Sequence, residues 1–306
     1  MASLNDLLNT AKNALAAQSF GLNVAGQNVT NLNTDGYVRR SADLETRVHN
    51  GPSYESINVA GLHRIADIYA ERRLNTAMVL SFAAEERNTN LTVVEALFND
   101  VAGAGIGANI DSLFASFSEL SANPNEPTTR STVLQRAEEF TQRARETPRE
   151  LEVFRQDEHD KARSLVRHGN EQSAEVTSLN RRIQVAEAGG SDAADLKDRR
   201  DSLLTNLSKL IDIRRCITES GQPVVQGAGT TLIESENYRD LAVDLDSNGN
   251  IRTLPSRSNE AAGNMTNLLG GGSLGGPVET RDVYLPAVNT QLDQLVFDIA
   301  TAFDAR

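Results

Sequence analysis

The chain has 306 residues, a formal net charge of −12, no tryptophan and a single cysteine, Cys216. The acidic balance excludes an ordinary nucleic-acid binder, because phosphate contacts need clustered Lys and Arg. One cysteine excludes an internal disulfide framework and a cysteine-based zinc site. No run of about 18 apolar residues is present, so we expect no membrane-spanning helix and no membrane partner. The N-terminus lacks the basic and apolar blocks of an ordinary secretory signal.

The first 32 residues carry apolar side chains at alternating steps of three and four. This heptad pattern predicts an amphipathic helix, with Gln18 as the one polar interruption. The apolar members are Leu8, Ala11, Leu15, Leu22, Ala25, Val29 and Leu32. A lone helix of this kind is marginal in water. The stripe therefore either docks on the rest of its own domain or receives helices from elsewhere.

The next segments alternate between helical patterns and turn signals. We expect the first helix to stop near residues 33–36, an Asn/Asp/Gly cluster. The later expectations are extended chain over 37–58, a helix over 65–98, a flexible glycine-containing junction over 99–109, and a short helix from 110 to 122.

Residues 128–188 predict one long, highly charged helix, and residues 196–211 a return helix after the turn at 189–192. Residues 130–215 hold 17 Lys or Arg against 16 Asp or Glu, which indicates exposed helix faces with interleaved charges. Three acid–base pairs at i,i+4 spacing should support the helices: Glu139–Arg143, Asp157–Lys161 and Asp195–Arg199. Pro148 should kink or interrupt the long helix.

After residue 215 the pattern changes to short strand-like runs separated by Gly and Asn. The expected fold is therefore mainly α, with long helices forming a helical hairpin or coiled-coil-like bundle and a small β region near 217–255. A Gly-rich loop over 270–276 should lead into a last helix over 281–306. That helix reaches the chain end without a cap, so we expect a fragment or a shortened chain. The predicted domains are 1–60 (heptad helix and extended linker), 61–216 with 277–306 (helical bundle), and 217–276 (β region and loop).

Patterns that could carry chemistry have simpler structural explanations. Residues 271–275 match G-x-S-x-G, but no strand precedes them and no histidine follows them, so we expect a loop. Asp244, Asp246 and Asn248 resemble half of a calcium loop, but Pro255 stands where a bidentate Glu would be needed, which favours a β-turn. His159 and His168 are too far apart on a helix to share a metal. We therefore expect no enzyme, no cofactor and no metal site.

A longer motif is more specific. Residues 28–39, Asn-Val-Thr-Asn-Leu-Asn-Thr-Asp-Gly-Tyr-Val-Arg, resemble the N-[IV]-[AS]-N-x-[ND]-T-x-G-[YF]-x-R motif that ends the first helix of bacterial flagellar axial proteins. The chain departs from that pattern at Thr30, where Ala or Ser is common, and at Asp35, often Pro. The matching residues, which should form the turn that leaves the helix, are Asn28, Asn31, Asn33, Thr34, Gly36, Tyr37 and Arg39.

Two further blocks are similar to the hook-associated protein 1 family among these axial proteins. One is residues 198–204, Asp-Arg-Arg-Asp-Ser-Leu-Leu, which resembles the helix closing that family's α-hairpin. The other is residues 272–286, with Gly272-Ser-Leu-Gly-Gly, Arg281-Asp282 and Leu285-Pro286, and the spacing of both blocks fits.

The resemblance implies a structural protein at the junction between flagellar hook and filament. Its implied partners are copies of itself in a helical ring, the hook protein and the next junction protein. An export chaperone would join them only if a further C-terminal segment exists. The resemblance also implies export through the flagellar type III channel and an extracellular location on the flagellum. It assigns Leu8, Leu15, Leu22 and Val29 to helix–helix assembly. Two alternatives stay open, namely another axial protein of hook or rod type, and a coiled-coil scaffold unrelated to motility.

Overall fold

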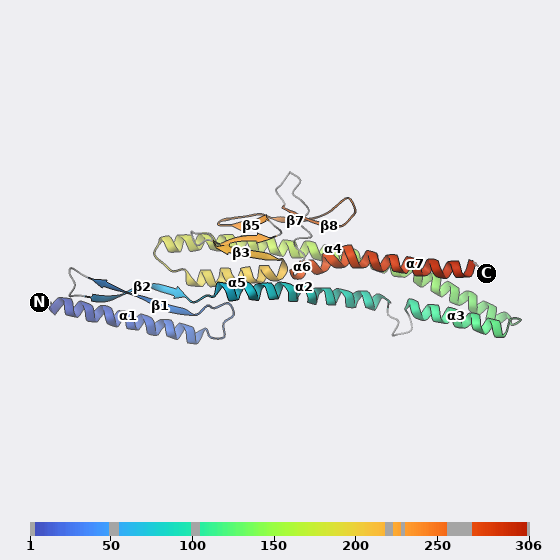
Figure 1. The fold of residues 1–306 in the computed structure, drawn as a ribbon, viewed down its shortest axis with the longest axis horizontal. Coiled ribbons are helices and arrows are strands. Elements are labelled where there is room, and N and C mark those ends of the chain that lie inside the picture. The colour runs from blue at the N-terminus through green and yellow to red at the C-terminus, as the bar shows by residue number, and fades with distance from the viewer. Residues whose placement is uncertain are drawn as a thin grey trace.

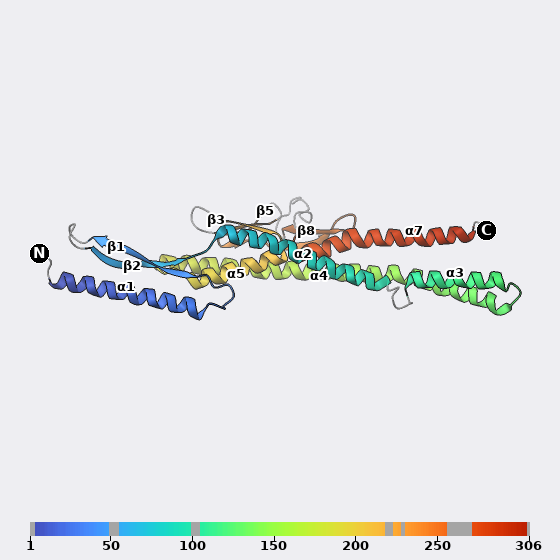
Figure 2. The same ribbon diagram turned by 60° about the horizontal axis from the view of Figure 1, so that its bottom comes forward.

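The computed structural model describes residues 4–48, 55–98, 105–217, 223–227, 230–255 and 271–304. The molecule is elongated, and its N- and C-terminal ends lie at opposite ends of the long axis (Figures 1 and 2). Among the described residues, no helix is long and apolar enough to cross a membrane.

Helices make up most of the length. In chain order they are α1 (Leu4–Thr30), α2 (Ile68–Phe98), α3 (Ile106–Ala122), α4 (Pro127–Ala188), α5 (Ala194–Leu210), α6 (Gly272–Glu279), the π-helical turn η3 (Thr280–Tyr284) and α7 (Leu285–Asp304). The strands form three small antiparallel sheets, β1–β2, β3–β4–β5–β6 and β7–β8. The strands are β1 (Arg40–Val48), β2 (Glu55–Arg64), β3 (Ile213–Ile217), β4 (Pro223–Gly227), β5 (Thr230–Glu234), β6 (Asn237–Tyr238), β7 (Leu241–Leu245) and β8 (Ile251–Pro255). The mainly α fold with a small β region is confirmed.

The N-terminal unit consists of α1 lying along the β1–β2 hairpin (Figure 1). The hairpin was expected only as extended chain, and its register runs from Arg40 opposite Arg64 to Val48 opposite Glu55. Ala17 and Val24 are the buried hydrophobic residues of α1, at 2 and 4% exposure. The helix therefore docks through small side chains.

The middle of the molecule is the α4–α5 hairpin with the four-stranded sheet on one side. Its core joins both helices to the strands and to α6, and includes the fully buried Val176, Leu204, Leu207, Ile233 and Leu274. A second core lies toward the C-terminal end, where α3 and α7 pack against the first part of α4. There Leu113, Phe140, Leu292 and Ile299 are buried together.

Pro148 was expected to kink or interrupt the long helix, and the interruption is wrong, because α4 runs as one 62-residue helix through it. Proline removes one backbone donor from the helix. The neighbouring Thr147 is fully buried, and its hydroxyl donates to the Arg143 carbonyl at 3.0 Å. Phe140, two turns earlier, lies in the second core, and Leu151, one turn later, packs with Val94 of α2 and Leu285 of α7, so tertiary packing keeps the helix continuous.

The glycine-rich loop expected over 270–276 is wrong for residues 272–276, which begin α6. A Cβ on Gly276 would lie 2.3 Å from Glu86 Cγ, so this short helix packs directly against α2. Residues 106–109, expected in a flexible junction, belong to α3. In both places burial stabilises a helix that the glycine content argued against.

The three predicted i,i+4 ion pairs also give way to other contacts. Glu139 accepts from Arg136, Lys161 donates to Glu86 of α2, and Asp195 pairs with Arg40 of β1. The Glu139 pair stays within α4 at i,i+3 spacing, whereas Lys161 and Asp195 take tertiary partners. Exposed pairs along one helix contribute only about 0.3–0.5 kcal/mol, so such partners easily replace them.

Candidate assembly site

The side chain of Asn28 organises the turn that follows α1. Its Nδ2 donates to the Arg40 carbonyl at 2.8 Å, and its Oδ1 accepts from the Arg40 backbone N–H at 3.0 Å. The Tyr37 hydroxyl donates to the same Oδ1 at 2.9 Å. One amide thus imitates a strand partner for Arg40, and ties the last turn of α1 to the first residue of β1.

The rest of the predicted turn is looser. Thr34 Oγ1 donates to Asn31 Oδ1 at 3.2 Å, which closes the chain after the helix. Gly36 has φ +79°, a conformation that suits glycine. A Cβ there would lie 3.3 Å from Ser202 Cβ of α5. Asn33 and Arg39 are exposed, so the structure does not bring them into the hydrogen-bonded turn.

The four residues assigned to assembly share one face of α1 and point away from the hairpin. Leu8, Leu15, Leu22 and Val29 expose 59, 71, 73 and 75% of their surface. Leu15 and Leu22 each precede a buried residue by two positions, and two residues turn a helix by about 200°. We call these four residues the outer face of α1. The heptad stripe is therefore not what docks the helix on its own hairpin.

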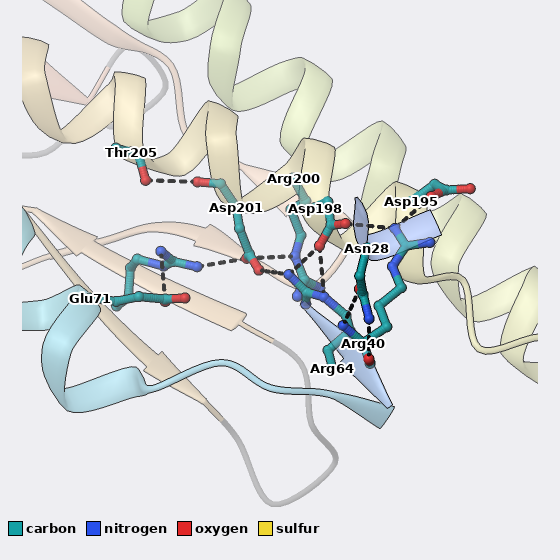
Figure 3. A network of polar contacts seen from close by, with 10 residues as sticks. Asn28, Arg40, Arg64, Glu71, Asp195, Asp198, Arg200, Asp201 and Thr205 are labelled. Atoms are coloured by element: carbon teal, nitrogen blue, oxygen red, sulfur yellow. Dashed lines mark hydrogen bonds and ion pairs between the residues drawn. The ribbon is translucent and has the colours of Figure 1, made fainter. Parts of the chain in front are cut away.

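A network of arginines and aspartates joins the N-terminal unit to the helical bundle (Figure 3). Asp198 of α5 accepts from Arg40 of β1 at 2.7 Å and from Arg64 of β2 at 2.7–2.8 Å. Asp201, one turn further along α5, pairs with Arg64 at 2.8 Å and with Arg215 of β3 at 2.7 Å. Both hairpin strands, α5 and the four-stranded sheet thus meet in one chain of ion pairs.

The pairs nearest the hairpin are well shielded from water. The side chains of Arg40 and Asp198 are only 7 and 10% exposed. Burial alone lowers the pKa of Arg40, but the hydrogen bonds to Asp198 and Asp195 outweigh it and raise the pKa. Arg40 also lies over the Tyr37 ring, 4.8 Å from its centroid. A buried charge of this kind depends strongly on its partner.

Sequence reasoning singled out Arg39, whereas the buried partner of α5 is Arg40. Arg64 was missed altogether. One signal was available, because Asp198 and Asp201 are three residues apart and therefore share a helix face. That spacing predicts two carboxylates aimed at common partners, although Arg40 and Arg64 lie more than 130 positions away in the chain.

The third block quoted from the sequence holds the C-terminal end of the chain to the bundle and the β7–β8 turn. Gly272 has φ +67°, and a Cβ there would meet the Lys209 and Leu210 carbonyl oxygens at 2.7 Å. Arg281 donates to the Gly249 carbonyl at 2.7 Å, and Asp282 accepts from the Ile251 backbone at 2.7 Å.

The residues of the half calcium loop form the turn between β7 and β8. Asp246 Oδ1 accepts the backbone N–H groups of Asn248 and Asn250 at 2.8 and 2.9 Å. Its carboxylate thus supports the turn. No cluster of three metal-ligating side chains occurs within the described ranges.

The fold and this site define an elongated, mainly helical protein with one exposed apolar face on its first helix. The family model of the flagellar hook-associated protein FlgK helical domain matches residues 91–306. The chain belongs to this family.

Relatives with established names agree with the family. The chain is 27% identical over 313 residues to flagellar hook-associated protein 1 of Salmonella typhimurium, covering 99% of this chain and 56% of that protein. It is 26% identical over 334 residues to flagellar hook-associated protein 1 of Bacillus subtilis, covering 97% and 66%. Among solved structures, the flagellar hook junction protein FlgK from Burkholderia pseudomallei shares the fold, with a TM-score of 0.54 at 22% identity over 68% of this chain and 39% of that one. The chain therefore spans little more than half the length of the Salmonella relative.

Proposed function

We propose that the chain is a structural, non-enzymatic subunit of the hook–filament junction of the bacterial flagellum, and that it assembles through the outer face of α1. Family membership and the names of the relatives support the junction role. The implied partners are further copies of the chain, the hook protein and the next junction protein. Export through the flagellar type III channel would bring the chain to the flagellum.

One observation carries the assembly role. Leu8, Leu15, Leu22 and Val29 form a heptad stripe that stays exposed although α1 is already docked by its opposite side. Each Leu or Val side chain buried against a neighbouring helix contributes about 1.5–3 kcal/mol, so these four residues can support a stable helix–helix contact. The turn around Asn28, Gly36 and Tyr37 would set the direction in which the chain leaves this contact.

The test compares two double variants of the chain in its source organism. Leu15→Asp with Leu22→Asp places two charges on the outer face of α1. Ala16→Asp with Asn23→Asp places the same two charges at adjacent exposed positions about a quarter-turn away. Mass spectrometry of sheared hook–filament structures measures how much chain is incorporated.

We expect the first pair to lose incorporation at least tenfold, while the second pair stays near wild type. Circular dichroism of the purified variants should show the same helix content, since all four positions are exposed. Equal incorporation of both double variants would show that the outer face of α1 is not needed for assembly. Absence of the wild-type chain from clean flagella would remove the junction role itself.

A further inference from the structure

A cavity of about 740 Å³ lies where the end of β2, the first half of α2, α5 and β3 meet. Five arginines line it against three acidic residues, Glu71, Asp201 and Asp212. We call it the arginine pocket, and its arginines are Arg64, Arg72, Arg200, Arg214 and Arg215. Val79, Ile213 and Pro223 add apolar wall. The pocket is thus a locally basic site on an acidic chain.

Part of this positive charge is not used inside the subunit. Arg64 and Arg215 are paired with aspartates, but the exposed Arg72 and Arg214 form no side-chain hydrogen bond or ion pair within the described part of the chain. The Arg200 side chain is only 13% exposed, and its Nε forms an ion pair with Asp201 Oδ1 at 3.7 Å but no hydrogen bond among the described residues. Its Nη1 reaches Asn180 at 3.4 Å. Arg72 and Arg214 therefore remain available to a carboxylate from outside.

The opposite charge is concentrated near the other end of the molecule. Between Arg87 and Arg130 the sequence contains no Lys or Arg and five Asp or Glu. Between Arg281 and Arg306 it again contains no Lys or Arg, and four Asp. These stretches include α3 and α7, which pack together beside the start of α4 (Figure 1). The exposed carboxylates of α3, of α7 and of the turn after α3, which we call the acidic end, are Asp111, Glu119, Glu126, Asp293 and Asp298.

The acidic end also has apolar side chains available for contact. Phe114 is 49% exposed, Phe297 64% and Phe303 40%. An acidic surface with aromatic side chains complements a basic pocket with an apolar wall. The two surfaces lie on different parts of one elongated chain, so they can meet only between copies.

We propose that the arginine pocket receives the acidic end of a second copy of this chain, staggered along the long axis. Two different surfaces make this a head-to-tail contact, which repeats into a ring or a helix rather than closing a dimer. The contact rests on the assembly role proposed above and supplies it with a second interface, separate from the outer face of α1. Complementary charge would set its orientation and speed its formation.

Cross-linking through the natural thiol tests this contact. Cys216 is exposed and lines the arginine pocket, and it is the only cysteine in the sequence. Ser121→Cys adds a thiol at the exposed end of α3, and Ser191→Cys adds one in the exposed turn before α5 as a matched control. The purified chain is oxidised with copper phenanthroline at low salt and over a range of protein concentrations, and oligomers are separated on denaturing gels.

We expect Ser121→Cys to give chains of cross-linked oligomers. The wild type has one thiol and can give only dimers, and Ser191→Cys should stay at that level because its second thiol lies outside both surfaces. Arg72→Glu with Arg214→Glu should reduce the Ser121→Cys oligomers about tenfold. Arg73→Glu with Arg239→Glu, exposed arginines outside the pocket, should leave them unchanged. Glu119→Arg with Glu126→Arg should reduce them like the pocket pair, and a chain carrying both reversals should restore them.

Equal oligomer yields from Ser121→Cys and Ser191→Cys would overturn this contact, and so would pocket reversals that change nothing. Either result leaves the role of α1 intact, because incorporation of the Leu15→Asp and Leu22→Asp variant is measured separately. Conversely, if the chain cross-links as expected but is absent from flagella, the contact between copies is supported and the junction role is contradicted.

Discussion

Arg40 and Asp198 are 158 positions apart in the chain, yet their side chains meet at 2.7 Å and are almost completely buried. The pair joins the first residue of β1 to the second turn of α5. Together with the Arg64 pairs, it holds the α1–hairpin unit in its orientation on the helical bundle.

Replacing Asp198 should be far more costly than replacing its neighbour. Asp198→Ala leaves Arg40 and Arg64 buried without their shared acceptor, and we expect a loss of about 3–5 kcal/mol in the free energy of unfolding. Asp195 also pairs with Arg40 Nη2, at 2.6 Å, but its side chain is 90% exposed. Asp195→Ala should therefore stay within about 0.5 kcal/mol of wild type. Urea denaturation of both variants measures the difference, and similar losses would contradict the importance of burial.

Asn28→Ala should loosen the turn after α1. The change leaves the Arg40 backbone N–H and the Tyr37 hydroxyl without their acceptor. We expect a loss of about 2 kcal/mol. Hydrogen exchange should become faster around residues 36–41, whereas Asn23→Ala, an exposed change on the same helix, should leave it unaltered. Unchanged protection in Asn28→Ala would show that the turn holds without this amide.

Glu158 should make stability fall as pH rises. Burial raises its pKa, and Lys161 only partly opposes that effect. The folded chain then holds this proton more strongly than the unfolded chain, so its contribution is complete below the ordinary Glu pKa and is lost as pH rises through the raised value. Glu158→Gln keeps the size of the side chain and removes the titration. Urea denaturation at pH 4 to 8 should show the variant gaining stability relative to wild type as pH increases, and a constant difference would contradict this.

Two glycine replacements should act in opposite directions. Gly276→Ala places a Cβ 2.3 Å from Glu86 Cγ, and overpacking of this kind costs about 1–3 kcal/mol. Gly21→Ala in α1 meets no atom within 4 Å and should stabilise by about 0.5–1 kcal/mol, because Ala favours helix. Thermal unfolding of the two single variants measures both signs, and a neutral Gly276→Ala would mean that α6 can shift away from α2.

The helices could be predicted because their evidence is local. Apolar spacing located α1, α2, α3, α4 and α5 to within a few residues, and the Asn-Gly turn between β7 and β8 was equally readable. The continuity of α4 at Pro148 and the helix α6 were not predicted. Pro and Gly lower local helix stability, but the packing that offsets this loss comes from residues distant in the sequence. The predicted β region near 217–255 begins slightly earlier, at Ile213.

The site was predictable only in part. The exposed leucines of α1 follow from heptad spacing, but spacing alone could not tell which side of the helix the hairpin covers. Ala17 and Val24 carry too little apolar surface to reveal it. The choice of Arg40 over Arg39 depends on which side of β1 faces α5, and strand registers of this kind are set by tertiary contacts.

The length of α4 has a consequence for any array built from this chain. At about 1.5 Å per residue, its 62 residues span roughly 93 Å without a break. One end carries α3 and α7, and the other leads through the turn at 189–192 to α5 and the N-terminal unit. This one continuous helix thus sets the separation between the two ends of the molecule. The axial repeat of an assembly would then depend on the number of helical turns in α4. Inserting or deleting one turn of α4 would change the pitch of the whole array.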